Sequence, residues 1–216
     1  MGVRPAGTVT FLFTDIEGST RLWDELPDSM GVVLARHDEI VRSAIERHDG
    51  FVFATGGDGF AAAFGRADGA VGAAVDAQRL LSMEVWPEQV TLRVRMGVHT
   101  GEAQERDGKY FGPPVNRAAR IMGAANGGQL VVSSLTAELL GKSGDVEMVD
   151  LGSVQLKGVA DLVHVSGCLP RGTRGWTSRW CRCRRAPATS LVCTTTESVI
   201  WRPCRRGCHG SRRPGW

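Results

Sequence analysis

The stretch VTFLFTDIEGST, residues 9–20, decides how the chain begins to fold. Its first half is a short run of apolar and β-branched residues, which predicts a buried strand over residues 9–13. Thr14 and Asp15 close this run, so the strand delivers a carboxylate at its C-terminal end. An acidic side chain at the end of a buried strand is the first candidate for a functional residue.

A short helix is predicted over residues 17–26, directly after that carboxylate. Its first turn contains the small residues Gly18, Ser19 and Thr20. Small residues at a helix start leave backbone N–H groups open, and such groups bind phosphate and other anions. The sequence therefore predicts a phosphate-binding segment beside Asp15.

The chain up to residue 99 alternates strand and helix patterns in the order βαββαβ, and a further helix and strand follow by residue 132. Apolar residues recur at steps of three and four after Asp28, a good N-cap, and stop at Gly50, a good C-cap. The other elements are strands over 51–55, 60–64, 91–99 and 130–132, helices over 69–82 and 114–122, and a glycine-rich loop over 101–113. This order predicts an α+β fold, the ferredoxin-like, palm-type arrangement of one helix-faced antiparallel sheet, with a C-terminal extension.

Two carboxylates are predicted to form one site. Asp58 lies at the tip of a tight hairpin turn, GGDG at 56–59, between two of the predicted strands. Asp15 and Asp58 supply the hard oxygen ligands that Mg²⁺ prefers, and the carbonyl of Ile16 can add another; a pair of such ions suits phosphoryl transfer. A structural interpretation stays open, in which Asp15 caps the next helix and Asp58 is only a turn residue.

Five segments, in order, resemble the catalytic domain of class III adenylyl and guanylyl cyclases, and most of all its soluble actinobacterial type. They are FTDIEGST at 13–20, TGGDGF at 55–60, RMGVHTG at 95–101, YFGPPVNRAARI at 110–121 and LKG at 156–158. The resemblance covers residues 8–165, about three quarters of the chain. It implies a nucleotidyl cyclase that converts a nucleoside triphosphate, most readily ATP, to a 3′,5′-cyclic nucleotide and pyrophosphate for intracellular signalling.

The resemblance also implies roles for single residues. Asp15, the carbonyl of Ile16 and Asp58 would hold two Mg²⁺ or Mn²⁺ ions per site. Asn116 and Arg120, four residues apart on one helix face, match the family's ribose-orienting asparagine and transition-state arginine. A guanidinium suits charge that spreads over phosphate oxygens.

Further implied features are a triphosphate lysine and a dimer. Lys157 matches the family's lysine that binds the triphosphate. In the family the metal carboxylates come from one subunit and the asparagine and arginine from its partner, so the resemblance implies a head-to-tail homodimer with two equivalent sites. His99 lies in a matched motif but at a strand end, where we expect a structural role rather than a catalytic one.

The positions that select the base depart from the family pattern. Adenylyl cyclases of this family place a lysine four residues before the second metal-binding aspartate and an aspartate three residues before the glycine of the FG pair. Here these positions hold Ala54 and Lys109. Lys109 can donate to adenine N1 or to guanine O6, but no acceptor faces the exocyclic amine of adenine. The choice between ATP and GTP therefore stays open, although the metal and phosphate ligands remain.

Two other functions stay compatible with the sequence. A degenerate cyclase domain would bind a nucleoside triphosphate without turnover and act as a regulatory dimerisation module. The GGDG turn also resembles the hairpin of diguanylate cyclases, but Gly59 is not acidic, and the helix with Asn116 and Arg120 counts against that function. The retained metal, ribose and phosphate residues favour the nucleotidyl cyclase.

Charge divides the chain near residue 170. Residues 1–170 hold 15 Lys and Arg against 22 Asp and Glu, whereas residues 171–216 hold 11 Arg against one acid, Glu197. We therefore predict a catalytic domain over residues 1–168 and a basic, disordered tail rich in Arg, Cys and Trp over residues 169–216. A gene read out of frame near Arg171 would also explain this composition.

The composition predicts few partners besides nucleotide and a second copy of the chain. The tail cysteines Cys181 and Cys183 are spaced too closely for a usual zinc site. The tail also lacks the patterned aromatics or helix that dock on nucleic acid, so we expect no nucleic-acid partner. No run of about 18 apolar residues could span a bilayer, and no cysteine precedes Cys168. We therefore expect a cytoplasmic protein without a membrane partner.

Overall fold

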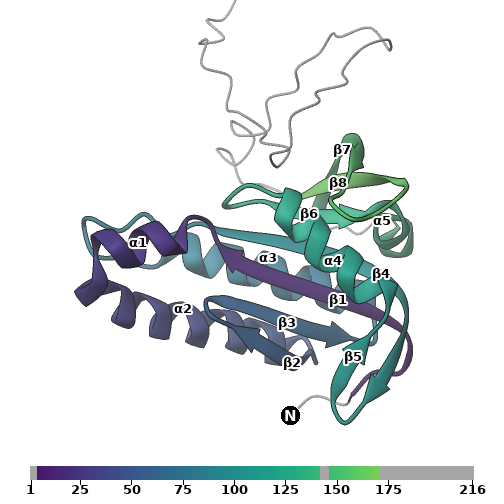
Figure 1. Ribbon diagram of the computed structural model, residues 1–216, viewed down its shortest axis with the longest axis horizontal. Helices are drawn as coiled ribbons and strands as arrows, with labels where there is room; N and C mark the ends of the chain where they lie inside the picture. Colours follow the sequence, from purple (N-terminus) through teal and green to yellow (C-terminus); the bar gives the residue numbers. More distant parts are fainter. Residues whose placement is uncertain (1–3, 142–145, 171–216) are drawn as a thin grey trace, which may run out of the picture. The chain divides into compact units, whose positions relative to one another are not determined.

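The computed structural model describes residues 4–141 and 146–170, whose strands form one eight-stranded sheet (Figure 1). The strands lie in the order β2-β3-β1-β4-β6-β8-β7, and β5 pairs with β4 outside this path. The elements are β1 (Gly7–Ile16), α1 (Ser19–Glu25), α2 (Pro27–Arg47), β2 (Phe51–Gly56), β3 (Gly59–Phe64), α3 (Ala67–Met83), β4 (Val94–Arg106), β5 (Lys109–Phe111), α4 (Pro113–Ala124), β6 (Leu130–Ser133), α5 (Ser134–Leu140), β7 (Val146–Gln155) and β8 (Leu162–Pro170).

The first four strands of the sheet confirm the predicted ferredoxin-like core. β2, β3, β1 and β4 are neighbours in that order, and each neighbouring pair is antiparallel. A βαββαβ chain gives this order when its helices cover one face of the sheet. Beyond this antiparallel core the sheet is mixed, because β6 pairs with β4 in parallel. The chain reaches β6 through the helix α4, and a helical crossover is what parallel neighbours require.

β1 is buried on both faces, which explains its nearly continuous apolar sequence. Leu12 and Ile16 belong to the main core, to which α2 and α3 contribute most of the helical residues. Val9 and Phe11 point the other way, into a smaller core that includes Ala118 of α4. Side chains alternate between the two faces of a strand, so a strand covered on both faces reads as an unbroken apolar run.

α4 packs closely along β4 because two glycines leave room for it (Figure 1). A Cβ on Gly97 would lie 2.2 Å from the backbone nitrogen of Met122. Nearer the start of the helix, a Cβ on Gly101 would lie 2.7 Å from the ring of Pro114. The helix therefore begins at the level of Gly101 and ends near the level of Gly97.

The long helix α2 begins and ends differently from the prediction. It starts at Pro27, so Asp28 lies in the first turn and is not the N-cap. Proline suits this position because it has no N–H that would be left without a partner. At the other end Asp49 takes a positive φ of 57° and Gly50 does not. Gly50 is needed for space instead, since a Cβ there would lie 2.5 Å from the ring of Phe64.

Most of the predicted glycine-rich loop is a β-hairpin. β4 continues to Arg106 and β5 pairs back to it, around a turn in which Asp107 and Gly108 have positive φ. β5 pairs with residues 104–106, whereas from Gly101 to Ala103 the partner of β4 is the start of β1, with Gly7 opposite Ala103. That partner is distant in the chain, so the local sequence pattern could not indicate the longer strand.

The described chain continues in β8 to Pro170, two residues past the predicted domain boundary. The predicted basic tail beyond it, with the cysteines considered as zinc ligands, lies outside the described residues. Within residues 4–141 and 146–170, no helix is both long enough and apolar enough to cross a membrane.

Candidate functional site

The tip of the β2–β3 hairpin lies against the end of β1. Gly57 has a φ of 61°, as the first central residue of a type II′ hairpin turn needs. The backbone N–H of Phe60 donates to Oγ1 of Thr14 over 3.1 Å. A Cβ on Gly59 would lie only 2.6 Å from the carbonyl oxygen of Thr14. A threonine hydroxyl and a glycine therefore hold this hairpin tip against β1.

This contact places Asp15 and Asp58 at one corner of the sheet. The N–H of Ile16 donates to Oδ2 of Asp58 over 3.2 Å, and Asp15 is the preceding residue. The interpretation of Asp15 as a helix cap is wrong, because the N-cap of α1 is Gly18 and no side chain caps that helix. Asp58 does lie in the hairpin turn, where it also bonds the backbone of β1.

Arg95 is a residue of this corner that the sequence did not single out. It lies opposite Asp15 in the register of β1 and β4. Its Nε donates to Oδ2 of Asp15 over 2.7 Å, and its Nη2 donates to the same oxygen. The alternation of Arg93 and Arg95 with apolar residues indicates that both leave the core. Only the strand register shows that one of them meets Asp15.

The donors at this corner suit a hard divalent cation. Two carboxylates and the backbone carbonyl of Ile16 offer only oxygen, which is the donor type of Mg²⁺ sites. One of the carboxylates already pairs with a guanidinium, so the corner attracts positive charge. Nowhere in the described part of the chain do three or more His, Cys, Asp or Glu side chains gather to hold an ion. Asp15, Ile16 and Asp58 are therefore candidate ligands for such an ion.

The predicted phosphate-binding segment is a turn into a short helix. Gly18 has a φ of 71°, and α1, which Ser19 begins, has seven residues. Gly18 and Thr20 are exposed and Ser19 is half-buried. Glu17 anchors the segment, because its carboxylate accepts the N–H of Gly127 over 2.9 Å. The segment lies directly beside the two carboxylates and faces solvent.

Asn116 and Arg120 lie on the outer face of α4, away from the carboxylates of the same chain. Both are exposed, whereas Ala118 and Ile121 of the same helix are buried. α4 reaches the level of Gly97 only at its end, and Asp15 lies still further along. With about 1.5 Å per helical residue and 3.3 Å per strand residue, Asn116 is roughly 15 Å from the level of Asp15. One chain therefore does not bring Asn116 to the carboxylates.

Lys157 is exposed in the turn between β7 and β8. The N–H of Val159 donates to the carbonyl of Leu156 over 3.1 Å, and Gly158 has a φ of 75°, as a type II turn requires at its third residue. Through β6, Val165 of β8 lies at the level of His99, and the N-terminal end of β8, which follows the Lys157 turn, extends from there away from the level of Asp15. Lys157 therefore also lies apart from the carboxylates of its own chain.

The two positions predicted to form the base pocket lie beside an aromatic cluster. The rings of Phe53 and Tyr110 pack with their centroids 5.1 Å apart, which joins β2 to β5. Ala54 follows Phe53 at a bulge in β2, and Lys109 precedes Tyr110; both are exposed. The structure thus brings together β2, which carries Ala54, and β5, which carries Lys109. Of these two residues, only Lys109 is charged.

His99 lies in a buried network of hydrogen bonds, in the structural setting that we expected for it. It is only 5% exposed. The hydrogen bonds run from Nδ1 of His99 to Oγ of Ser133 (2.8 Å), then to Thr136 (3.0 Å), Thr100 (3.1 Å) and Thr10 (3.0 Å). This network joins β1, β4, β6 and α5 through polar groups inside the protein.

We expect the free energy of unfolding to fall as the pH drops from about 6.5 to about 4. Burial, and then the positive charge of Arg117, lower the pKa of His99 to about 4. In this window the unfolded chain binds a proton that the folded chain does not, which costs about 3 kcal/mol in total. Burial also lowers the pKa of His37, so that histidine adds to the loss.

Urea unfolding between pH 4 and pH 8 measures this effect. The variant His99→Asn places an amide where Nδ1 bonds Ser133 but cannot take up the proton. Its stability should therefore depend less on pH in this window than that of the unchanged protein. Equal slopes for the two proteins would contradict the assignment to His99.

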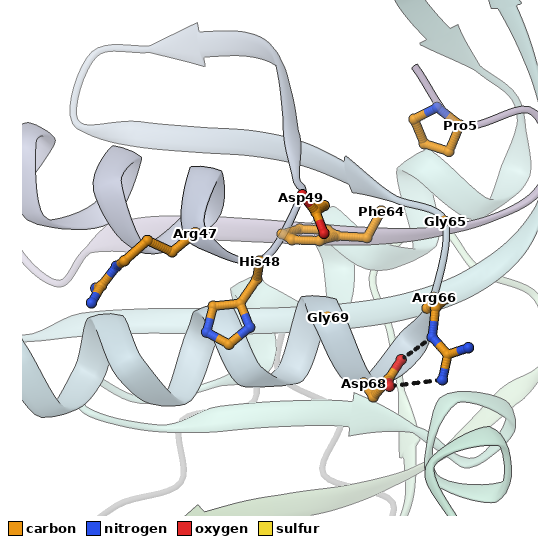
Figure 2. Close-up of a pocket in the computed structure, with 9 residues that line it drawn as sticks. All are labelled: Pro5, Arg47, His48, Asp49, Phe64, Gly65, Arg66, Asp68 and Gly69. Carbon is orange, nitrogen blue, oxygen red and sulfur yellow. Dashed lines mark hydrogen bonds and ion pairs between the residues drawn. The ribbon is translucent and has the colours of Figure 1, made fainter. Parts of the chain in front are cut away.

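A hollow of about 470 Å³ lies away from this corner (Figure 2). Phe64, which lines it, is at the opposite end of β3 from the hairpin tip. Two of its charged residues already pair with each other, since Arg66 makes two hydrogen bonds of 2.9 Å to Asp68. The lining residues are Pro5, Arg47, His48, Asp49, Phe64, Gly65, Arg66, Asp68 and Gly69. None of the predicted site residues is among them.

Comparison with known sequences finds similarity over most of the described chain. The family model of the adenylate and guanylate cyclase catalytic domain matches residues 1–166. An uncharacterized protein of Mycobacterium tuberculosis is 43% identical over 159 residues, which are 72% of this chain and 53% of that protein. The adenylate cyclase of Lachancea kluyveri is 36% identical over 157 residues, with 60% of this chain and 8% of that enzyme covered. The chain thus spans about half the length of the mycobacterial relative, and far less of the yeast enzyme.

Solved structures of similar fold include two adenylyl cyclases. An adenylate cyclase from Trypanosoma brucei, solved in its monomeric state, has a TM-score of 0.70 and 29% identity, with 76% of this chain and 88% of that chain covered. The adenylyl cyclase CyaB from P. aeruginosa has a TM-score of 0.66 and 22% identity, with 78% and 96% covered. At 22% identity, the similarity to CyaB shows the fold alone.

Proposed function

The chain belongs to the family of adenylate and guanylate cyclase catalytic domains, and from this premise we propose that it is a nucleotidyl cyclase. Its substrate in this proposal is a nucleoside triphosphate, with ATP preferred, and its products are a 3′,5′-cyclic nucleotide and pyrophosphate. The observation that carries the proposal is the corner at which Asp58 bonds the backbone of β1 beside Asp15. The preference for ATP draws on relatives such as the adenylate cyclase of Lachancea kluyveri.

Asp15, the carbonyl of Ile16 and Asp58 hold two Mg²⁺ or Mn²⁺ ions in this proposal. The ions supply positive charge, which lowers the pKa of the ribose 3′-hydroxyl and offsets the charge of the leaving pyrophosphate. Thr14 and Gly59 position the second carboxylate, because they fix the hairpin tip against β1. The backbone N–H groups of Gly18, Ser19 and Thr20 bind phosphate oxygens beside it.

The remaining groups come from a second copy of the chain. Asn116 orients the ribose, Arg120 offsets the charge that develops on the transferred phosphate, and Lys157 binds the triphosphate. The 3′-hydroxyl then gives up its proton to solvent, and its oxygen bonds to the α-phosphorus as the bond to pyrophosphate breaks. The outward placement of Asn116 and Arg120 supports a head-to-tail homodimer, because in one chain Asn116 is roughly 15 Å from the level of Asp15.

The base pocket offers a donor without a matching acceptor. Lys109 can donate to adenine N1 or to guanine O6, and Ala54 offers no polar group. We therefore expect ATP to be preferred by a small factor only, because the pocket has no acceptor that could hydrogen-bond the exocyclic amine of adenine. The proposal includes a cytoplasmic signalling role without a membrane or nucleic-acid partner.

Product analysis by mass spectrometry tests the proposed function. The purified full-length chain is incubated with Mn²⁺ and each nucleoside triphosphate in turn. We expect 3′,5′-cyclic AMP from ATP, a smaller amount of cyclic GMP from GTP, and neither product in EDTA or with the variant Asp58→Asn. ATP binding without any cyclic product would indicate the degenerate, regulatory domain. A cyclic dinucleotide from GTP would indicate a diguanylate cyclase.

A further inference from the structure

The guanidinium of Arg95 occupies the charged corner on which the proposed function depends. We propose that Arg95 is an internal counter-ion of the metal site, which weakens the binding of free divalent ions and so couples metal binding to nucleotide binding. This inference rests on the proposed metal site. The proposed metal ligands alone do not assign a role to Arg95.

The backbone of Arg95 is fixed beside Asp15. The two residues are opposite each other within a continuous antiparallel ladder, with Thr14 opposite Met96 on one side and Ile16 opposite Val94 on the other. The side chain is less constrained, because it is 33% exposed. The guanidinium can therefore swing into solvent while its backbone stays in the sheet.

Arg95 binds Asp15 through one oxygen only. Both of its hydrogen bonds go to Oδ2, and neither goes to Oδ1. The Asp15 side chain is 25% exposed, so the second oxygen remains available to another ligand. A divalent ion at Asp15 would then lie a few ångströms from the guanidinium, and the two positive charges would repel each other.

The charge balance of the corner changes when a nucleotide arrives. Without ligands, the two carboxylates repel each other and Arg95 offsets part of their charge. A free divalent ion competes with Arg95 for that charge, and a screened repulsion over a few ångströms weakens its binding by about tenfold. A nucleoside triphosphate brings several negative charges, which stabilise the ion and the guanidinium together. Arg95 thus favours the metal–nucleotide complex over the free metal.

The binding of Mn²⁺ alone, measured by the electron paramagnetic resonance of free Mn²⁺, tests the inference without any turnover. Arg95→Gln should bind Mn²⁺ about tenfold more tightly than the unchanged protein, and Arg95→Met, a second neutral variant of similar length, should do the same. Arg95→Lys keeps the charge and should stay within about twofold of the unchanged protein. The matched control is Arg93→Gln, since Arg93 lies on the same face two residues earlier but makes no hydrogen bond to Asp15; it should change little.

A thermal unfolding series gives a second readout. In EDTA, Arg95→Gln should unfold at a lower temperature than the unchanged protein, because its two carboxylates have lost their counter-ion. Mn²⁺ should then raise its unfolding temperature by more than it raises that of the unchanged protein.

The outcomes separate this inference from the proposed function. If the unchanged protein binds Mn²⁺ and the neutral variants bind it no more tightly, Arg95 does not oppose the metal, and the metal site itself stands. If Asp15→Asn binds Mn²⁺ as well as the unchanged protein does, the ion binds elsewhere. The metal site and the role of Arg95 are then both wrong.

Discussion

A mixture of Asp15→Ala and Asn116→Ala proteins is expected to form cyclic nucleotide although neither protein does so alone. Each substitution removes one half of every site in a homodimer, which should lower activity by about 100-fold or more. In a heterodimer both defects fall in the same site, so the other site is intact. Random pairing of equal amounts then restores about a quarter of the unchanged activity.

A second mixture provides the control for this experiment. Asp15→Ala and Asp58→Ala remove groups from the same half of the site, so every site in every dimer remains defective. Their mixture should stay inactive. The shared-site arrangement is wrong if the first mixture also stays inactive after the two chains have exchanged, or if the second mixture recovers as well as the first.

Replacing Gly97 with alanine is expected to destabilise the fold by about 3 kcal/mol or more. The added Cβ would lie 2.2 Å from the backbone nitrogen of Met122, and a helix backbone cannot turn aside as a flexible side chain can. α4 would have to move off the sheet, carrying Asn116 and Arg120 with it. Urea unfolding measures the loss, and cyclase activity should fall with it.

The matched control is Gly123→Ala in the same helix. A Cβ on Gly123 meets nothing within 4 Å. Alanine is the better helix former, so this variant should gain up to about 1 kcal/mol of stability. If Gly97→Ala is instead as stable as the unchanged protein, α4 does not rest on β4 at this glycine.

The sequence alone determined the element order and the family. The apolar run before Asp15 and the GGDG turn before Phe60 are local signals, because a strand and a tight hairpin impose their own residue pattern. The resulting βαββαβ order predicted the ferredoxin-like core, which the strand order confirms. The five motifs predicted the cyclase family, which the match over residues 1–166 confirms.

Local patterns were less informative where backbone pairing partners are distant in the chain. The segment after Gly101 has the glycines of a loop, yet β4 continues through it to Ala103 as the partner of the start of β1. The parallel position of β6 likewise depends on where α4 carries the chain. In both cases the deciding hydrogen bonds join residues that no local window contains.

Only the tertiary structure decided which charged groups meet. The sequence shows Arg93 and Arg95 as equivalent polar positions of one strand, but the register of β1 with β4 places Arg95 opposite Asp15. It also shows Asn116 as part of the same set of motifs as Asp15, whereas the packing of α4 on Gly97 holds the two apart in one chain. Periodicity reports which face a side chain occupies, and strand register and helix packing set its neighbours across that face.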